Sequence, residues 1–476
     1  MKKHISLCLA ILLVLVSLSG CQRAVDSGSQ YSEYESYYYE DVEGDTSGGN
    51  GDNASGGKSS GNSSGKTNSS DNGIITSDTT TADDYQKTNI IGVPTSLKNA
   101  NIKLTSFYDP GSSDNTTAFY WALQKYQELY GKNTVKLITT SSETGYKEKV
   151  IAMMAGGDTP ELLELKTAWM PTWAIENMVQ PVDGLIDYTK LHYQGLISSA
   201  TYKGKHYVAC PNGMWSTMIW YNKALFSKYG VKSPMDYYKG EGWTWDTFKK
   251  AAKDIKEASG GSVSGFATES LDMLLRSQKN GLVNKNSNDS YTNNMRSAEV
   301  ANAMQVMYEM IYTDKSWNPD LTAARTKFAK SKVAMSASVI GFYQNYCKGL
   351  EYKDLEVVPL PKPSASDDYY CSAYGIFWAI GAGCKNPEGA VAFMKILAQY
   401  EDTDFSNRTP LERILTDDQL ALTRSISEKA GTMTHVSLSW DPYNFWNDFS
   451  TKNIPVATVI DTYYNEVDAA VAKIND

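Results

Sequence analysis

The sequence predicts an α/β protein whose folded part forms two lobes behind a long N-terminal tether. Strand and helix patterns alternate from Ile102 onward, which is typical of α/β chains. Roughly 380 residues follow the tether, which is more than one hydrophobic core usually holds. Residues 44–73 are nearly all Gly, Ser, Asn and Asp, with almost nothing to bury.

The N-terminus carries the pattern of an exported lipoprotein. Lys2 and Lys3 precede a short apolar run, residues 5–18, which is shorter than the roughly 20 residues of a membrane span. The run ends at Leu18-Ser19-Gly20-Cys21, the bacterial lipoprotein cleavage pattern. We therefore expect a signal peptide over residues 1–20, lipidation of Cys21 by acyl chains such as palmitate, and anchoring on the extracytoplasmic face of the cell membrane. An ordinary secretory signal is the alternative.

Residues 21–97 are expected to form the lipidated, disordered tether. About 75 residues of flexible coil span roughly 45–50 Å on average. Tyrosines alternate with acidic residues over 31–39. We interpret this segment as more solvated tether, and a partner or cell-wall contact is the alternative.

The first folded segment has the order strand, helix, strand, helix, strand. This order predicts a parallel sheet with right-handed crossovers, on which ligands bind beyond the carboxyl ends of the strands. The strands are expected over 102–107, 135–139 and 162–165, and the helices over 114–130 and 145–155.

A second unit begins after Pro211, and strand–helix alternation returns in the last third of the chain. Residues 284–294 are polar and predict a loop. The other expected elements are a strand over 215–221, helices over 223–229 and 295–312, a helix capped by Thr244, a helix beginning at Asn386-Pro387-Glu388, and a final helix over 459–473.

Composition excludes several functions. The net charge of −9 argues against a nucleic-acid partner. The four histidines show no metal-ligand spacing, so no metal site is expected.

Free thiols are favoured at Cys210, Cys347, Cys371 and Cys384, since a body of this size needs no disulfides, but pairing of Cys371 with Cys384 stays open.

Four stretches together resemble the family 1 extracellular solute-binding proteins of carbohydrate ABC transporters. Two departures are Pro160-Glu161, where the family usually has Pro-Asp, and Ser331, where a glycine is usual. The stretches are 146–183, with Met153-Met154-Ala155-Gly156-Gly157-Asp158; 202–248, with Trp220-Tyr221-Asn222-Lys223; 328–335; and 357–390, with Val357-Val358-Pro359-Leu360-Pro361.

The resemblance implies a periplasmic-binding-protein-like (Venus flytrap) fold with a cleft between the lobes. Lobe 1 is expected over 98–212 plus 333–368, and lobe 2 over 214–332 plus 372–476. The chain is expected to cross between them near 211–214, 333–335 and 369–375. A monomer that captures a sugar or oligosaccharide by hinge closure, and hands it to the permease subunits of an ABC importer, is the implied function. No cofactor and no catalytic residue are expected.

Sugar rings pack on aromatic faces, and their hydroxyls need polar side chains. Candidate ligand-binding residues therefore combine both kinds at expected strand ends, crossings and loops. Trp173, Trp220 and Trp245 are interpreted as core residues instead. The candidates are Tyr108, Asp109, Lys166, Trp169, Trp215, Tyr374 and, at positions where related proteins place an aromatic ring, Phe342 and Trp440 with its neighbour Asp441.

Three other functions stay open. The same fold can bind a non-sugar solute, such as a peptide, a polyamine or a cofactor fragment. A secreted glycoside hydrolase needs two carboxylates about 5–9 Å apart, and no motif singles out such a pair. A wall adhesin or scaffold is suggested only by the tyrosine-rich segment.

Overall fold

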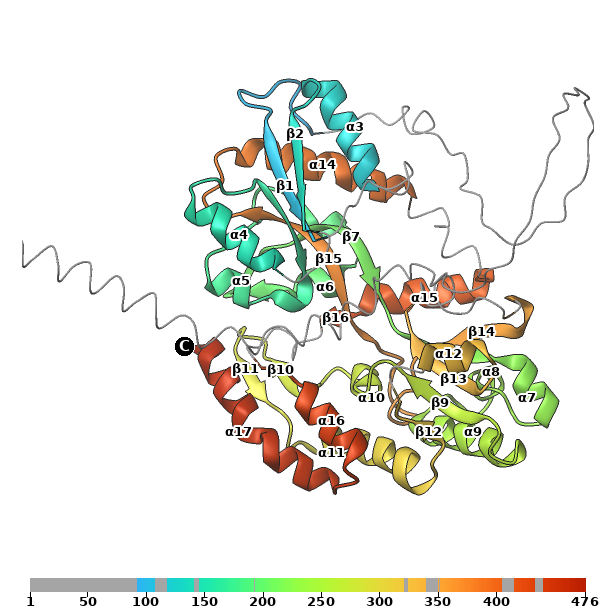
Figure 1. Ribbon diagram of the computed structural model, residues 1–476. Coiled ribbons are helices and arrows are strands. Elements are labelled where there is room, and N and C mark those ends of the chain that lie inside the picture. The colour runs from blue at the N-terminus through green and yellow to red at the C-terminus, as the bar shows by residue number, and fades with distance from the viewer. Residues whose placement is uncertain are drawn as a thin grey trace, which may run out of the picture. The chain divides into compact units, whose positions relative to one another are not determined.

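Two mixed β-sheets, each packed with helices, form the part of the chain that this computed structural model describes (Figure 1). The expected signal peptide, Cys21 and nearly all of the expected tether lie outside the described residues. None of the described helices combines the length and the apolar character needed to cross a bilayer. The described residues are 92–107, 118–140, 145–191, 193–320, 324–339, 350, 352–404, 415–432 and 440–476.

The sheet of the first lobe is built on three parallel strands, as the alternation predicts, and is completed by strands from later in the chain. β1 pairs in parallel with β2 and β3, and β15 pairs antiparallel with β3, β4 and β7. The strands are β1 (Ile102–Ser106), β2 (Val135–Thr139), β3 (Leu162–Lys166), β4 (Val179–Gln180), β7 (Ala209–Trp215), β15 (Ser372–Gly381) and β16 (Gly431–Thr432).

Helices and one hairpin surround this sheet. Apolar side chains of the strands and helices form a continuous core, which includes Leu104, Phe119 and Trp378. The helices are α3 (Ala118–Tyr130), α4 (Tyr146–Ala155), α5 (Thr172–Ile175), α6 (Gln194–Ser199) and α14 (Pro387–Asp404), and the hairpin is β5 (Thr201–Tyr202) with β6 (Lys205–His206).

The sheet of the second lobe has the strand order β12-β9-β13-β8-β14. Gly265 allows β9 to approach α9 closely, because a Cβ atom at this position would lie 2.0 Å from the carbonyl oxygen of Ala252. The strands are β8 (Met218–Asn222), β9 (Ser264–Thr268), β12 (Trp317–Asn318), β13 (Val333–Ser338) and β14 (Leu355–Val358).

The helices of the second lobe bury a separate core, which includes Phe248, Met304 and Phe445. Beside them lies the hairpin of β10 (Val283–Lys285) and β11 (Tyr291–Asn293), which packs on α17. The helices are α7 (Lys223–Tyr229), α8 (Pro234–Lys239), α9 (Trp245–Ala258), α10 (Met273–Arg276), α11 (Ala298–Tyr308) with the π-helix Glu309–Thr313, α12 (Ala324–Ala329), α15 (Asp417–Lys429), α16 (Tyr443–Thr451) and α17 (Val456–Asn475).

The expected division of the chain between the lobes is wrong for three segments, the shortest of which is β16: it pairs with β15 and so belongs to the first lobe. β13 pairs with β8 and β9, and β14 pairs with β8, so residues 333–338 and 355–358 belong to the second lobe. β15 pairs with β3, so the segment from Ser372 through α14 belongs to the first lobe. β13 and β15 are both buried, so their sequences alone do not show which of the two sheets each strand joins.

Two of the expected crossings lie close to where the structure has them. The chain leaves the first lobe at Ser216–Thr217, between β7 and β8, and returns where β15 begins at Ser372. The expected crossing at 333–335 is wrong, since it falls inside β13. The expected strand over 215–221 is in fact the end of β7 and most of β8, separated by this crossing, and the expected loop over 284–294 contains the β10–β11 hairpin.

The cysteines that the structure describes are free thiols, as favoured. Cys210 and Cys371 are buried and Cys384 is partly buried. Burial raises the pKa of both Cys371 and Cys384 to about 11. Cys347 lies outside the described residues.

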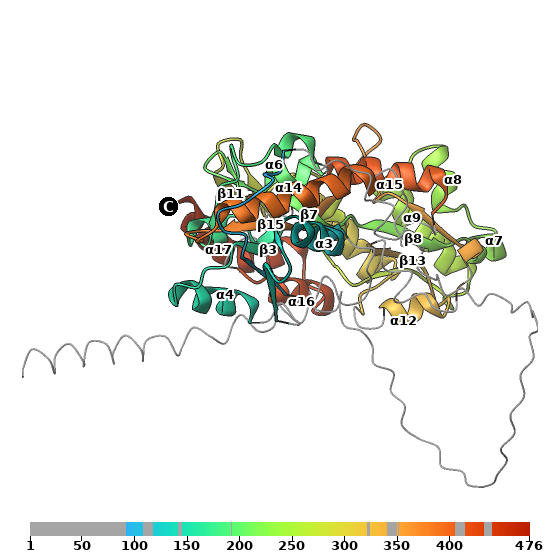
Figure 2. The same ribbon diagram turned by 90° about the horizontal axis from the view of Figure 1, so that it is seen from above.

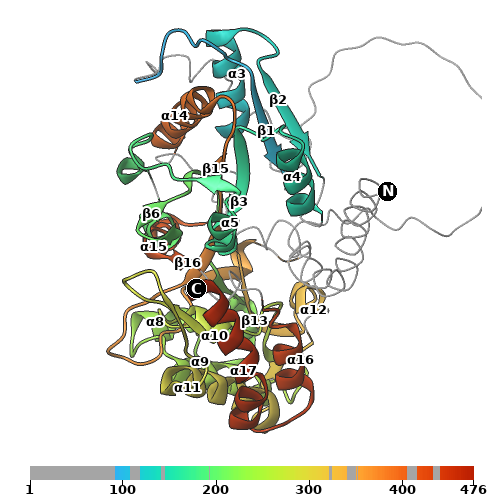
Figure 3. The ribbon, with the colours of Figure 1, turned by 90° about the vertical axis from the view of Figure 1, so that its left-hand side faces the viewer.

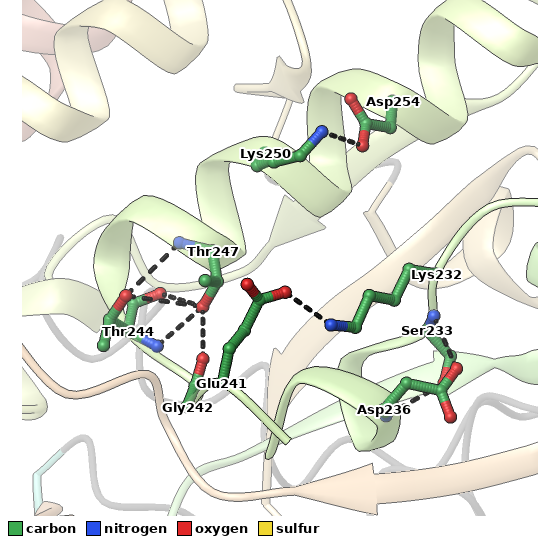
Figure 4. Close-up of polar contacts among 9 residues, drawn as sticks. All are labelled: Lys232, Ser233, Asp236, Glu241, Gly242, Thr244, Thr247, Lys250 and Asp254. Carbon is green, nitrogen blue, oxygen red and sulfur yellow. Dashed lines mark hydrogen bonds and ion pairs between the residues drawn. The ribbon is translucent and has the colours of Figure 1, made fainter. Parts of the chain in front are cut away.

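Helix α9 begins where the sequence predicts, because Thr244 caps it. The Thr244 hydroxyl accepts a hydrogen bond from the Thr247 N–H at 3.3 Å, and the Thr247 hydroxyl accepts one from the Thr244 N–H at 2.8 Å (Figure 4). This reciprocal pair satisfies two donors that the first turn of a helix otherwise leaves unpaired. Ser233 and Asp236 make the same arrangement at the start of α8.

We expect Thr244→Ala to lower the free energy of unfolding by about 1 kcal/mol, the usual cost of removing a helix cap. Urea unfolding followed by circular dichroism measures this change. Thr462→Ala, on the exposed face of α17, is the control, because this hydroxyl donates only to the carbonyl oxygen of Thr458 one turn earlier. Equal unfolding midpoints for the two variants would contradict the role of the cap.

Candidate functional site

Lys166 ends β3 and lies at the carboxyl edge of the first-lobe sheet. Its side chain is fully buried, and its ammonium lies 5.8 Å from the centre of the Phe107 ring and 6.0 Å from the centre of the Trp169 ring. Phe107 directly follows β1, the neighbouring parallel strand. The carboxyl ends of parallel strands meet at one edge of a sheet, so Phe107 and Lys166, 59 positions apart in the chain, come together there.

Trp169 is the outermost ring of an aromatic stack at this edge. Its ring stacks on Trp173 at 5.3 Å with an interplanar angle of 10°, and Phe107 meets it edge-on at 5.4 Å. Trp173, Phe107 and Tyr146 are buried, whereas Trp169 is only partly buried. Among the tryptophan side chains that the structure describes, only Trp169 is not buried.

Tyr146, the first residue of α4, holds the base of this stack. Its hydroxyl lies 2.9 Å from the carbonyl oxygen of Glu164 and 3.0 Å from that of Thr105, so it ties α4 to both β3 and β1. Burial strongly raises the Tyr146 pKa, which keeps the hydroxyl protonated as a donor. A buried donor fixed in this way makes the platform under Trp169 rigid.

A second polar group follows β9 in the second lobe. The Arg276 Nε donates to the Asp272 carboxylate at 2.9 Å, and its Nη2 donates to the Ser270 hydroxyl at 3.0 Å. The Ser270 hydroxyl also bonds Asp272. All three side chains are buried, so the charge of Arg276 is balanced within its own lobe.

β15 connects the two groups across the lobe junction. The Gly375 N–H donates to the Thr167 hydroxyl at 3.1 Å, next to Lys166. Four residues earlier, the Cys371 sulfur accepts the Thr217 N–H at 3.3 Å, and the charges of Arg276 and Asp272 act on this thiol. Four residues of strand span roughly 13 Å. The arrangement therefore offers an aromatic ring and polar groups from both lobes along one strand.

The structure brings together only some of the predicted site residues. Lys166 and Trp169 lie side by side, and the backbones of Trp215 and Tyr374 are direct partners in the β7–β15 pairing at the junction. The structure describes only the backbone of Trp215 and Tyr374. Tyr108, Asp109 and Phe342 lie wholly outside the described residues. Their roles in ligand binding stay predictions.

Trp440 and Asp441 are placed in the second lobe, beside α16. Trp440 is 8 % exposed, its indole N–H donates to Glu466 at 3.3 Å, and its ring meets Phe445 edge-on at 6.0 Å. Asp441 accepts the Tyr443 N–H at 2.8 Å. Burial raises the Asp441 pKa, against the lowering effect of this hydrogen bond. Trp440 thus packs in the second-lobe core, and its role as a stacking ring stays a prediction.

Sequence reasoning missed Phe107 as a partner of Trp169, and it missed Ser270, Asp272 and Arg276. The available signal was the set of polar residues Glu269, Ser270 and Asp272 directly after β9. Trp173, Trp220 and Trp245 are buried, which confirms the prediction that they are core residues.

A cavity of about 890 Å³ lies elsewhere in the second lobe, between the start of α9, residues 363–370 and α15. It contains none of the predicted site residues. Two of its aromatic side chains hydrogen-bond within the protein: the Trp245 indole N–H donates to Ser277, and the Tyr369 hydroxyl accepts the Trp243 N–H. We therefore place the candidate site at the lobe junction.

Comparisons with known proteins agree with this architecture. An ABC transporter extracellular-binding protein of Pyrococcus horikoshii is 27 % identical over 119 residues, which cover 24 % of this chain and 27 % of that relative's length. The cyclic α-maltosyl-1,6-maltose binding protein of Arthrobacter globiformis is similar in structure, with a TM-score of 0.63 and 15 % identity, over 78 % of this chain and 99 % of that one. UgpB of Mycobacterium tuberculosis, in complex with glycerophosphocholine, has a TM-score of 0.59 and 14 % identity, over 78 % and 99 %.

These two structures share the two-lobe fold with this chain. The family model for bacterial extracellular solute-binding proteins matches residues 121–404, which is more than half of the 476-residue chain and includes both halves of the lobe junction. The chain therefore belongs to the bacterial extracellular solute-binding protein family.

Proposed function

We propose that this protein captures a sugar or oligosaccharide at the lobe junction and delivers it to an ABC importer. The observation that carries the proposal is Trp169, a partly uncovered ring on a rigid aromatic base beside the charged Lys166. The C–H face of a sugar ring packs on such a ring, while donors and acceptors at the rim bind its hydroxyls. The Arthrobacter relative binds an oligosaccharide with the same fold.

The charges around Trp169 also favour a sugar over a cationic solute. Lys166 places a buried ammonium beside the ring, and a polyamine that reached the ring would meet this like charge, at a cost that grows in a partly desolvated site. The charge of Arg276, on the second-lobe side, is balanced by Asp272 and does not contribute. UgpB binds glycerophosphocholine with a similar fold, so a phosphodiester is the non-sugar ligand to test first.

The proposed cycle consists of binding and release of the solute, and it needs no covalent step. Solute binds to one lobe, and the second lobe then closes by adding contacts of its own. The closed form would be recognised by the permease subunits of the importer. Lipidation of Cys21 would hold the protein at the extracytoplasmic face of the cell membrane, within reach of these subunits.

A panel of mono- and oligosaccharides, with glycerophosphocholine and spermidine, tests the ligand class. A ligand at 100 times its Kd stabilises the folded state by about 2.7 kcal/mol, so the true ligand raises the Tm clearly. Differential scanning fluorimetry detects the shift, and calorimetry gives the Kd. A rise with spermidine or glycerophosphocholine alone would refute the sugar assignment.

We expect Trp169→Ala to weaken binding of the ligand so identified by about 10-fold or more, which corresponds to roughly 1.4 kcal/mol of lost stacking and desolvation. Lys166→Met should also weaken it, because the ammonium beside the ring is lost. Titration calorimetry measures both. Tyr308→Ala, on α11 away from the junction, is the control for general loss of an aromatic residue. Unchanged affinity in both site variants would refute this placement of the site.

We expect Cys21→Ser to release the protein from the membrane fraction into the medium of the expressing bacterium. The physical reason is the loss of acyl chains, each buried CH₂ of which contributes about 0.8 kcal/mol to membrane binding. Fractionation with an antibody, together with metabolic labelling by palmitate, measures the effect. Ser19→Ala, which keeps the cysteine and a small residue before it, is the control. A Cys21→Ser protein that stays with the membrane would show another means of attachment.

A further inference from the structure

A polar contact joins the two lobes away from the strands that cross between them. The β5–β6 hairpin belongs to the first lobe, whose core includes the flanking residues Ala200 and Tyr207. The β10–β11 hairpin belongs to the second lobe, whose core includes Val283 and Tyr291. Lys285 and Asp289 of the second hairpin reach the first, and we call this contact the inter-lobe clasp.

Lys285 makes most of the hydrogen bonds of the clasp. Its ammonium donates to the carbonyl oxygen of Ser199 at 3.0 Å, and to the carbonyl and hydroxyl oxygens of Thr201 at 2.6 Å each. It also forms an ion pair with Asp289 at 3.0 Å. One side chain of the second lobe thus binds three oxygens of the first.

Asp289 completes the clasp from the turn of the same hairpin. Its Oδ1 accepts the Thr201 hydroxyl at 3.0 Å, and its Oδ2 accepts the Gly204 N–H. The Thr201 hydroxyl therefore donates to Asp289 while it accepts from Lys285. Five hydrogen bonds of this group therefore cross the lobe boundary.

The clasp is largely withdrawn from solvent, because the side chains of Lys285 and Asp289 are each 14 % exposed. Burial lowers the pKa of Lys285, against the opposing effect of Asp289. For Asp289, burial alone would raise the pKa, but the bonds from Gly204, Lys285 and Thr201 hold it below its usual value. Separating the hairpins would break the five hydrogen bonds to the first lobe, while the Lys285–Asp289 ion pair would stay within its own hairpin.

Each hairpin is also fixed to its own lobe. The side chain of Asn475 bonds both the N–H and the carbonyl oxygen of Tyr291, at 2.7 and 2.9 Å. In the first lobe, the Asp183 carboxylate accepts the His206 N–H at 2.9 Å. The clasp therefore connects two rigid bodies rather than two free loops.

The clasp lies on one side of the lobe junction. β6 and β11 lie on the side that carries α6, whereas α4 of the first lobe and α12 of the second lie on the opposite side (Figures 2 and 3). A rotation about the clasp and the crossing at Ser216–Thr217 would change the distance between α4 and α12 while leaving the clasp intact.

We propose that the inter-lobe clasp is a fixed, non-covalent pivot that confines the movement of the lobes to a single rotation. The backbone connections between the lobes at Ser216–Thr217, at Cys371–Ser372 and from α15 to β16 all lie at the junction itself. The clasp adds an attachment point away from them, and we expect it to suppress twisting of one lobe against the other. This proposal does not depend on which solute the site binds.

The test measures the distance distribution between nitroxide labels at Glu148→Cys on α4 and Lys330→Cys after α12, without ligand, by double electron–electron resonance. The background is Cys21→Ser, Cys347→Ser and Cys384→Ser, since Cys210 and Cys371 are buried. We expect Lys285→Met to widen the distribution at least twofold. Thr201→Val, which removes only the hydroxyl shared by Lys285 and Asp289, should widen it less.

Lys250→Met is the matched control, because Lys250 and Asp254 form an ion pair with the same four-residue spacing within α9 alone (Figure 4). We expect no widening in this variant. Unchanged widths in folded Lys285→Met and Thr201→Val proteins would overturn the proposal. If Lys285→Met does not fold, Thr201→Val decides alone, and an unchanged width then overturns the proposal.

Discussion

β15 is the element on which both the fold and the candidate site depend. It starts at the lobe junction and then runs between β3 and β7 in the middle of the first sheet. Its residues 376–380 are fully buried, so the strand is held on both faces and both edges. Gly375 is required where β15 passes α6, because a Cβ atom there would lie 2.4 Å from the Phe377 ring and 3.1 Å from Leu196. A strand this constrained positions both halves of the site relative to one another.

The separation of the cores explains how a fixed strand is compatible with moving lobes. The two apolar cores share no residue, so a rotation at the junction exposes neither of them. The contacts that such a rotation changes are polar or lie near the hinge, such as Tyr193 N–H with the Glu428 carboxylate. Rearranging polar contacts in the presence of water costs little compared with opening a core.

Much of the first lobe could be predicted from the sequence. The strands over 102–106, 135–139 and 162–166, and in the second lobe the cap at Thr244, follow local rules, namely apolar periodicity and side-chain capping. The lobe to which β13 and β15 belong could not be predicted in this way, because pairing between distant strands is a tertiary choice that buried apolar sequences do not encode locally. The resemblance gave the two-lobe fold, but it placed 333–368 in the wrong lobe.

The candidate site shows the same division. Lys166 and Trp169 were found because they lie at the end of a recognisable strand, and their proximity needs only the geometry of a parallel sheet. Ser270, Asp272 and Arg276 could not be predicted in this way, because β9 contains Gly265 and only one large apolar residue, Phe266, which weakens its strand signal. Trp440 is a candidate through the resemblance, and local sequence does not show that its ring packs against Phe445 or that Glu466, 26 residues later, accepts its indole N–H.

The way charges are satisfied at the junction determines what a ligand must supply. Arg276 is paired with Asp272 and Ser270 inside the second lobe. Its charge is therefore already balanced before the lobes close. Lobe closure in such a protein can be driven only by a ligand that binds the closed form more tightly than the open one. A ring that stacks on Trp169 and reaches the second lobe with its hydroxyls would have this property, because its contacts with the second lobe would exist only after closure. With twisting removed by the clasp, a ligand that closes the lobes has only one inter-lobe movement to restrict. The loss of conformational entropy that the ligand must offset is then smaller.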